Sequence, residues 1–314
     1  MLGRTAHAIY WMYRYLERAE NTARLLDAVF RMALTRGADA ASEEWNSVLA
    51  TLGIQEIYAQ AYDEITGPQV FNFVLRDRNN PGNVLQMIEQ ARSNARMSRS
   101  SLTLEVWEGV NEAWMNLRDL LARPVRESNL GAVLTSIRRE STAVRGATYG
   151  TMLRNEIYHF ARAGTFIERA ENTARILDVK YHLLLPSLAY VGSSLDSSQW
   201  DHVLRSLAGD RVYSWLNAGR IDPRGIAEFL ILDRRFPRSL TFCYGQLREN
   251  LAALAQEHGA EMPTQALLRD ADIRLEALTI EEIFDQGLHE FLVDFIAQNL
   301  QISFAIGEDY RFTA

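Results

Sequence analysis

The sequence has very little cysteine or lysine and no long apolar run. Cys243 is the only cysteine, so no disulfide can form within the chain and a reducing, cytoplasmic location is expected. Lys180 is the only lysine among 33 lysine and arginine residues. A lysine general base or Schiff-base residue is therefore excluded at every other position. No run of about 18 apolar residues occurs, which excludes a membrane-spanning helix. The N-terminal segment is charged and has no apolar stretch, so we expect no signal peptide.

The chain also lacks an excess of positive charge and the common catalytic motifs. Its formal net charge of −7 at pH 7 argues against a general nucleic-acid-binding protein. No Walker A, GxSxG or HExxH motif is found. The composition, with 47% hydrophobic and 23% charged residues, is ordinary for a globular protein. We therefore expect a single domain over residues 1–314 that has no phosphate-binding loop and no activated nucleophile.

Apolar residues recur with helical spacing along the sequence, and the alternation typical of strands is not found. Residues 4–36 contain no glycine or proline and predict one long helix that would end at Gly37. A second long helix is predicted from about 151 to 185, before Pro186 and with an interruption at Gly164. Further helices are predicted over residues 45–52, 101–122, 196–208, 238–257, 264–277 and 287–306. The pattern predicts an all-α helical bundle.

One phrase of eleven residues occurs twice. Residues 17–27 read ERAENTARLLD and residues 168–178 read ERAENTARILD, so ten of the eleven positions are identical. A structural repeat needs only the apolar pattern to recur, whereas here the charged residues recur as well. Something more specific than burial therefore constrains these charged residues.

The duplication extends beyond this phrase. The matched positions keep the same order, with small shifts that loop insertions would cause. They include Trp45 with Trp200, Tyr58 with Tyr213, Phe73 with Phe229, Asp77 with Asp233, Pro81 with Pro237, and Asn94 with Asn250. The sequence therefore predicts two tandem repeats, about residues 1–150 and 151–314, related by a pseudo-two-fold axis.

Four charged residues of the first copy share one face of the predicted helix, within an arc of about 120°, and the second copy repeats them. They are Glu17, Glu20, Arg24 and Asp27, with Asn21 on the same face. A stripe of small residues, with Ala19 and Ala23 in the first copy, lies beside this face and permits another helix to come close. Two such helices could bring both charged faces together. The candidate ligand-binding residues are Glu17, Glu20, Arg24, Asp27, Glu168, Glu171, Arg175 and Asp178.

Three interpretations of these charged faces stay open. The carboxylates and arginines could form a salt-bridge lattice that fixes the pairing of the two halves. They could instead bind a ligand, with the arginines holding a carboxylate or phosphate and the acids holding an amino group. The Glu-x-x-Glu spacing also occurs in divalent-metal sites, but the arginines oppose a cation and no histidine follows the glutamates. We therefore predict no metal site.

The segments YWMYRYLERAENTARLLD and FIERAENTARILDVKYHLL resemble the bacterial alpha-E family, which is named for its all-helical fold and its glutamate–arginine motif. The resemblance covers essentially the whole chain, including the start MLGRTAHAIYW and the segment 229–239. Such proteins are typically found beside, or fused to, a circularly permuted ATP-grasp protein, and often near transglutaminase-like peptidases. The resemblance therefore implies a helper in peptide or amide synthesis. ATP and magnesium would bind to the ATP-grasp partner, and this chain would need no cofactor.

The expected function is an accessory subunit of an ATP-grasp peptide or amide ligase system, located in the cytoplasm and without a nucleic-acid or membrane partner. One alternative is a free-standing enzyme that acts on a small amine or peptide, with Glu17, Glu168, Glu20 or Glu171 as general base. The other is a purely structural helical scaffold. The association with ATP-grasp proteins is implied by the family and not by the chemistry of these residues. The structure around the charged residues is therefore needed to discriminate among these functions.

Overall fold

A computed structural model describes residues 2–34, 38–183 and 194–312 of the chain. These three ranges contain α-helices, one short 3-10 helix and no β-strand, so the predicted all-α fold is confirmed. None of their helices is long and apolar enough to cross a membrane. The elements are α1 (Gly3–Ala33), α2 (Ala38–Leu52), α3 (Gln55–Ala59), α4 (Gly67–Leu75), α5 (Val84–Met97), η1 (Arg99–Ser101), α6 (Leu104–Leu120), α7 (Glu127–Thr151), α8 (Glu156–Leu183), α9 (Ser194–Ser206), α10 (Asp210–Leu216), α11 (Pro223–Ile231), α12 (Leu240–His258), α13 (Pro263–Ala277), α14 (Ile280–Gln286) and α15 (Leu288–Asp309).

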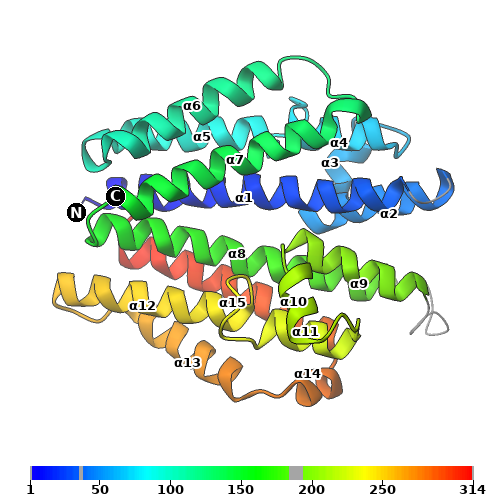
Figure 1. Cartoon of the computed structure of the whole chain (residues 1–314). Helices are drawn as coiled ribbons and strands as arrows, with labels where there is room; N and C mark the ends of the chain where they lie inside the picture. Colours follow the sequence, from blue (N-terminus) through cyan, green and yellow to red (C-terminus); the bar gives the residue numbers. More distant parts are fainter. Residues whose placement is uncertain (1, 35–37, 184–193, 313–314) are drawn as a thin grey trace.

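The two helices that carry the repeated phrase, α1 and α8, lie side by side across the middle of the molecule (Figure 1). On one side, α1 packs against α5 and α7, and α6 covers these two helices. On the other side, α8 packs against α12 and α15, and α13 lies outside them. Both copies of the charged phrase are therefore enclosed by helices from the two halves of the chain.

Small side chains allow α1 and α8 to approach closely. The alanines of the two phrases are fully buried: Ala19, Ala23, Ala170 and Ala174. Gly164 lies against the backbone of Tyr10, where a Cβ atom would come within 2.2 Å of the carbonyl oxygen. Only glycine fits that contact, because real Cβ atoms do not approach other atoms so closely. The predicted interruption at Gly164 is wrong, since α8 continues through this residue.

The other helix predictions need smaller corrections. The first helix ends at Ala33, before the predicted end at Gly37, which lies outside the described residues. The second phrase helix begins at Glu156 and not near residue 151, because α7 continues to Thr151 and a short turn follows. Its predicted end before Pro186 also lies outside the described residues. We predicted no separate helix for α7, whose outward face is rich in serine, threonine and glycine and so resembles a loop in composition.

Candidate functional site

The glutamates of each copy of the phrase pair with an arginine of the other copy. Arg169 on α8 donates from Nε and Nη2 to the two carboxylate oxygens of Glu17 on α1, at 2.8 and 2.9 Å. Arg18 on α1 donates in the same way to Glu168 on α8, at 2.5 and 2.8 Å. Forked, charge-assisted pairs of this kind demand a specific geometry. They fix the way in which α1 lies against α8, as expected for a salt-bridge lattice between the two copies of the phrase.

Two further arginines of the phrase bond within their own helices. Arg24 donates to Glu20 at 2.7 Å, and Arg175 donates to Glu171 at 2.9 Å. Both are pairs four residues apart, which lie on the same face of a helix. The phrase therefore forms two clusters, one centred on the glutamates of α1 and the other on the glutamates of α8.

The aspartates at the end of each phrase do not join these clusters. Asp27 lies about 10 Å along the helix from Glu20, at roughly 1.5 Å of rise per residue. It accepts hydrogen bonds from Arg31 at 3.3 Å and from Arg138 at 3.1 Å. Asp178 pairs instead with the Nδ1 atom of His289 at 2.5 Å. The structure thus brings together six of the eight candidate residues and leaves both aspartates with separate partners.

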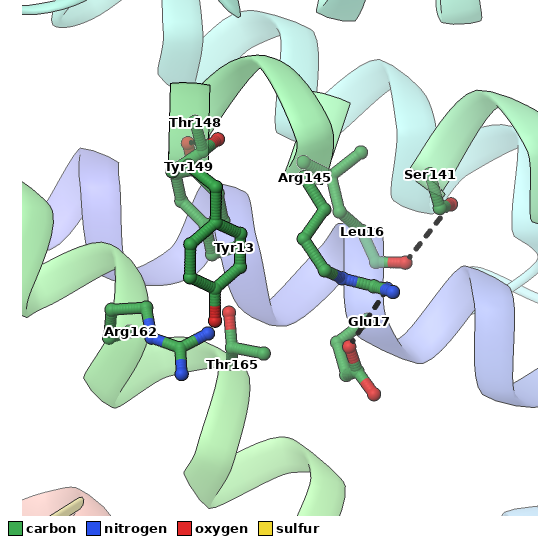
Figure 2. A pocket seen from close by; sticks show the side chains of 9 residues that line it. All are labelled: Tyr13, Leu16, Glu17, Ser141, Arg145, Thr148, Tyr149, Arg162 and Thr165. Carbon is green, nitrogen blue, oxygen red and sulfur yellow. Dashed lines mark hydrogen bonds and ion pairs between the residues drawn. The ribbon is translucent and has the colours of Figure 1, made fainter. Parts of the chain in front are cut away.

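Three arginines from outside the two phrases complete the clusters, and the sequence analysis missed all of them. In the first cluster, Arg145 of α7 donates to Glu17 at 3.4 Å and also to Glu20. Figure 2 shows its side chain reaching from α7 toward Glu17. Arg238, in the turn before α12, donates to Glu17 at 3.1 Å, to Glu20 at 3.2 Å and to the side-chain oxygen of Asn21 at 2.7 Å. Chain segments far apart in sequence therefore converge on the same two carboxylates.

The second cluster has one added arginine. Arg14, one turn before the first phrase, donates to Glu168 at 2.9 Å, to Glu171 at 3.5 Å and to Ser303 at 2.8 Å. Its guanidinium carbon also lies 4.5 Å from the ring centroid of Trp11, within the range of a cation–π contact. Helical spacing could have identified Arg14, which lies three residues before Glu17. No spacing rule links Arg145 or Arg238 to the phrase.

Burial and arginine contacts shift the pKa values of the buried carboxylates in opposite directions, and the effect of the arginines is the larger. Burial alone would raise the pKa of Glu17, but the charges of Arg169 and Arg238 outweigh it and hold that pKa well below its usual range. Likewise, burial would raise the pKa of Glu168, and Arg18 and Arg14 lower it. Each of these carboxylates is therefore firmly ionised.

The pKa values of the other buried groups in the first cluster also favour the ionised lattice. For Glu20, burial and the charge of Glu17 raise the pKa, but Arg238 and Arg145 bring it below its usual range. Burial lowers the pKa of Arg238 to about 10, which still leaves its guanidinium protonated at neutral pH. The first cluster is thus an array of full charges in which each of the described carboxylates is paired with arginines.

The residues of these clusters are poorly suited to general-base, nucleophilic or metal-ion catalysis. A carboxylate with a lowered pKa, already bonded by several arginines, is a weak general base at neutral pH. Cys243 is fully buried, and burial raises the pKa of its thiol to about 12, so it is not an activated nucleophile. Within the described residues, no group of three or more His, Cys, Asp or Glu side chains is placed to hold a metal ion. The side chain of Lys180 lies outside the described part of the chain.

The two clusters differ in the space beside them. The cavity next to the first cluster, lined by Tyr13, Glu17 and Arg145 (Figure 2), has a volume of about 20 Å³. That volume holds roughly one water molecule. The cavity next to the second cluster has a volume of about 310 Å³, which falls within the range of small-molecule sites. Its lining includes Tyr15, Arg18, Glu168, Glu171, Asn172 and Arg175. Of these two cavities, only the one beside the second cluster is large enough for a ligand.

Three mycobacterial proteins are similar to this chain over most of its length. An uncharacterized protein of Mycobacterium bovis is 24% identical over 313 residues, a match that covers 92% of this chain and 34% of the relative. Two uncharacterized proteins of Mycobacterium tuberculosis match with the same identity and coverage. The chain therefore spans about one third of the length of these relatives. No solved structure matches significantly.

A family model for a predicted α-helical domain with a conserved ER motif matches residues 1–310. The Glu-Arg dipeptide occurs twice in this chain, as Glu17-Arg18 and Glu168-Arg169. These four residues form the two forked ion pairs between α1 and α8. Because the match spans nearly the full length and its motif coincides with the charged centre of the fold, the chain belongs to the Alpha-E family.

Proposed function

We propose that this chain is an accessory subunit of an ATP-grasp peptide or amide ligase system, and that its charged centre holds the two halves together and recognises a ligand. The observation that carries this proposal is the pairing of Glu17, Glu20 and Glu168 with two or three arginines each. These carboxylates are buried, ionised and held by charge-assisted hydrogen bonds, which suits a rigid binding surface better than proton transfer. A ligase partner would supply ATP, magnesium and acyl activation.

The relatives support a role that depends on another protein unit. The matched region is about one third of each mycobacterial relative, so in those proteins an Alpha-E region is part of a longer polypeptide. A domain that works with a ligase can be fused to its partner or separate from it. The same association is implied by the family resemblance, and a transglutaminase-like peptidase would be a further partner.

The test is reconstitution of the reaction. This chain, a circularly permuted ATP-grasp protein from the same genome, and their mixture would be assayed for ADP release with amine and carboxylate substrates in the presence of magnesium. The chain alone should not hydrolyse ATP, the two proteins should co-purify, and amide formation should require the mixture. Equal amide formation by the ATP-grasp protein without this chain would contradict the accessory role.

The free-standing enzyme would give a different result. This chain alone would turn over an amine or peptide, and Glu20→Gln or Glu171→Gln would abolish turnover without lowering the melting temperature. We disfavour this outcome for Glu20, because the side chain is fully buried and its arginine partners lower its pKa. Glu171 is more exposed and is therefore the more stringent of the two tests.

We further propose that the chain consists of two tandem repeats related by an approximate two-fold axis, and that it acts in the cytoplasm. The reciprocal pairs between α1 and α8 support the symmetry, because each copy gives and receives the same forked bond. In a crystal structure, superposition of residues 1–150 on 151–314 should pair Trp45 of α2 with Trp200 of α9. An arrangement in which these residues did not superpose would contradict the two-fold relation.

A further inference from the structure

The turn before α5 and the turn before α12 are built in the same way. Asn83 and Ser239 are the N-caps of these helices, and each accepts a hydrogen bond from the backbone N–H three residues later, at 2.9 and 3.1 Å. Each cap side chain also donates to a backbone carbonyl oxygen, that of Asp77 at 2.9 Å and that of Asp233 at 2.5 Å. The two turns are therefore equivalent residue by residue, and the positions just before the caps correspond.

These corresponding positions hold different residues. Arg238 precedes one cap and inserts its guanidinium into the first cluster, with its side chain only 7% exposed. Gly82 precedes the other cap, lines the cavity of about 310 Å³ and has no side chain to insert into the second cluster. The cavity therefore lies where the guanidinium of an arginine at position 82 would be expected.

The hydrogen bonds of the carboxylates agree with this missing group. Glu17 and Glu20 each accept bonds from three arginines, and Arg238 is one of the three in both cases. Among the described side chains, Glu168 and Glu171 each accept from only two. An ionised carboxylate offers about four lone-pair sites. Each glutamate of the second cluster thus has capacity for the bond that its counterpart receives from Arg238.

We propose that the cavity beside Glu168 and Glu171 binds the guanidinium group of a ligand, namely an arginine side chain of a peptide or a small arginine derivative. The guanidinium donates to Glu168, Glu171 and Asn172, as Arg238 donates to Glu17, Glu20 and Asn21. Asn172 is the equivalent of Asn21 in the repeated phrase and lines the cavity.

The surroundings fit the rest of an arginine side chain. Leu52, Ile54 and Met87 line the same cavity and provide apolar contact for an aliphatic stem, which long charged side chains commonly bury. The three arginines that already surround Glu168 and Glu171 do not exclude the ligand, because the first cluster accommodates four guanidiniums around two carboxylates. The fork of a guanidinium also matches two neighbouring carboxylates better than an ammonium group does.

This inference deepens the proposed function by naming the chemical group that the chain recognises. Binding is measured on the isolated chain, so failure to bind would refute the guanidinium site alone. Failure of reconstitution with an ATP-grasp protein would refute the accessory role alone. The two proposals therefore remain distinguishable.

The test compares Nα-acetyl-L-arginine amide with the corresponding citrulline compound, which has nearly the same shape but no charge. Titration calorimetry on the purified chain should show saturable binding of the arginine probe and at least about tenfold weaker binding of the citrulline probe. The lysine counterpart should also bind more weakly. Free L-arginine, titrated in parallel, distinguishes a small-molecule ligand from a peptide arginine. A site for a peptide arginine should prefer the probe whose amino and carboxyl groups are blocked, whereas a site for a small arginine derivative should also bind free L-arginine.

Variants at position 82 provide the matched controls. A Cβ atom there would meet only the side chain of Asn80, at 3.5 Å, so larger residues can be accommodated. Gly82→Ala should bind the arginine probe like the wild type, whereas Gly82→Arg should block it by placing its own guanidinium in the cavity. Glu171→Gln offers a second variant and should weaken binding by about ten- to a hundredfold.

Three outcomes would overturn the proposal. The first is the absence of saturable binding by the wild type at probe concentrations up to about 10 mM. The second is equal affinity for the arginine and citrulline probes. The third is unchanged affinity in a folded Gly82→Arg protein, or in Glu171→Gln if the first variant does not fold.

Discussion

The forked pair between Glu17 and Arg169 should contribute strongly to stability, and Glu17→Gln is the sharpest way to test it. The substitution keeps the shape of the side chain but removes the negative charge that faces Arg169 and Arg238, whose side chains are only 8% and 7% exposed. Breaking a buried pair by removing one partner typically costs about 3–5 kcal/mol, because the remaining charge is left without compensation. For 314 residues, at about 2.1 cal/mol/K per residue, that cost corresponds to a decrease in melting temperature of about 5–8 °C.

Differential scanning calorimetry on a double-mutant cycle would isolate the pair. Arg169→Met should also destabilise, and the double variant should lose less than the sum of the two single losses, because the stranded charge is removed with its partner. Arg175→Ala serves as control, since that side chain is 40% exposed and its pair should contribute less than about 1 kcal/mol. A decrease of less than about 2 °C for Glu17→Gln, or full additivity in the cycle, would refute the reasoning.

Three further predictions follow from the geometry. The free energy of unfolding should decrease as the pH falls below about 4.5, the ordinary pKa of a glutamate. Glu17 and Glu168 have lowered pKa values in the folded state, so their contribution to stability is lost progressively as the pH falls from that ordinary value toward the lowered ones. Urea titrations between pH 3 and 7 that show constant stability would contradict this. Gly164→Ala should cost at least about 2 kcal/mol through its clash with a backbone carbonyl of α1, whereas Gly146→Ala, in open space on α7, should be neutral or stabilising in thermal melts. Cys243 should resist thiol reagents in the native protein and react only on unfolding, and rapid native labelling would show that its burial is incomplete.

Most of the fold could be predicted because it depends on local patterns. Helical periodicity, the absence of strand alternation and the position of prolines identified α1, α8, α12 and α15 within a few residues. The prediction failed at Gly164, where glycine serves a contact between helices rather than a break within one. Sequence alone cannot distinguish these roles, since both arise from the missing Cβ atom and only the neighbouring helix decides between them.

The candidate site could be predicted only in part. The repetition of charged residues identified the hydrogen-bond acceptors, such as Glu17 and Glu168. Burial alone does not require the same charged residues at the same positions of both phrases, whereas specific ion pairing does. The repetition also included Asp27, which shares the helix face but lies farther along the axis and pairs with Arg31 and Arg138. Most of the missing donors could not be found this way. Arg145 and Arg238 belong to other helices and turns, and their contacts depend on tertiary packing that no local spacing encodes.

Two nearly identical phrases therefore do not imply two equivalent sites. Each phrase supplies the same carboxylates, and the surrounding helices determine how many arginines neutralise them. In the first cluster, Arg238 fills the remaining position and leaves space for about one water molecule. At the second cluster, Gly82 occupies the corresponding position and a cavity of about 310 Å³ is present. The first cluster holds the helices together and also shows, within the same molecule, the bonds that a guanidinium ligand would make at the second cluster. On the guanidinium proposal, one position, held by Arg238 in one turn and by Gly82 in the other, separates a structural cluster from a binding site.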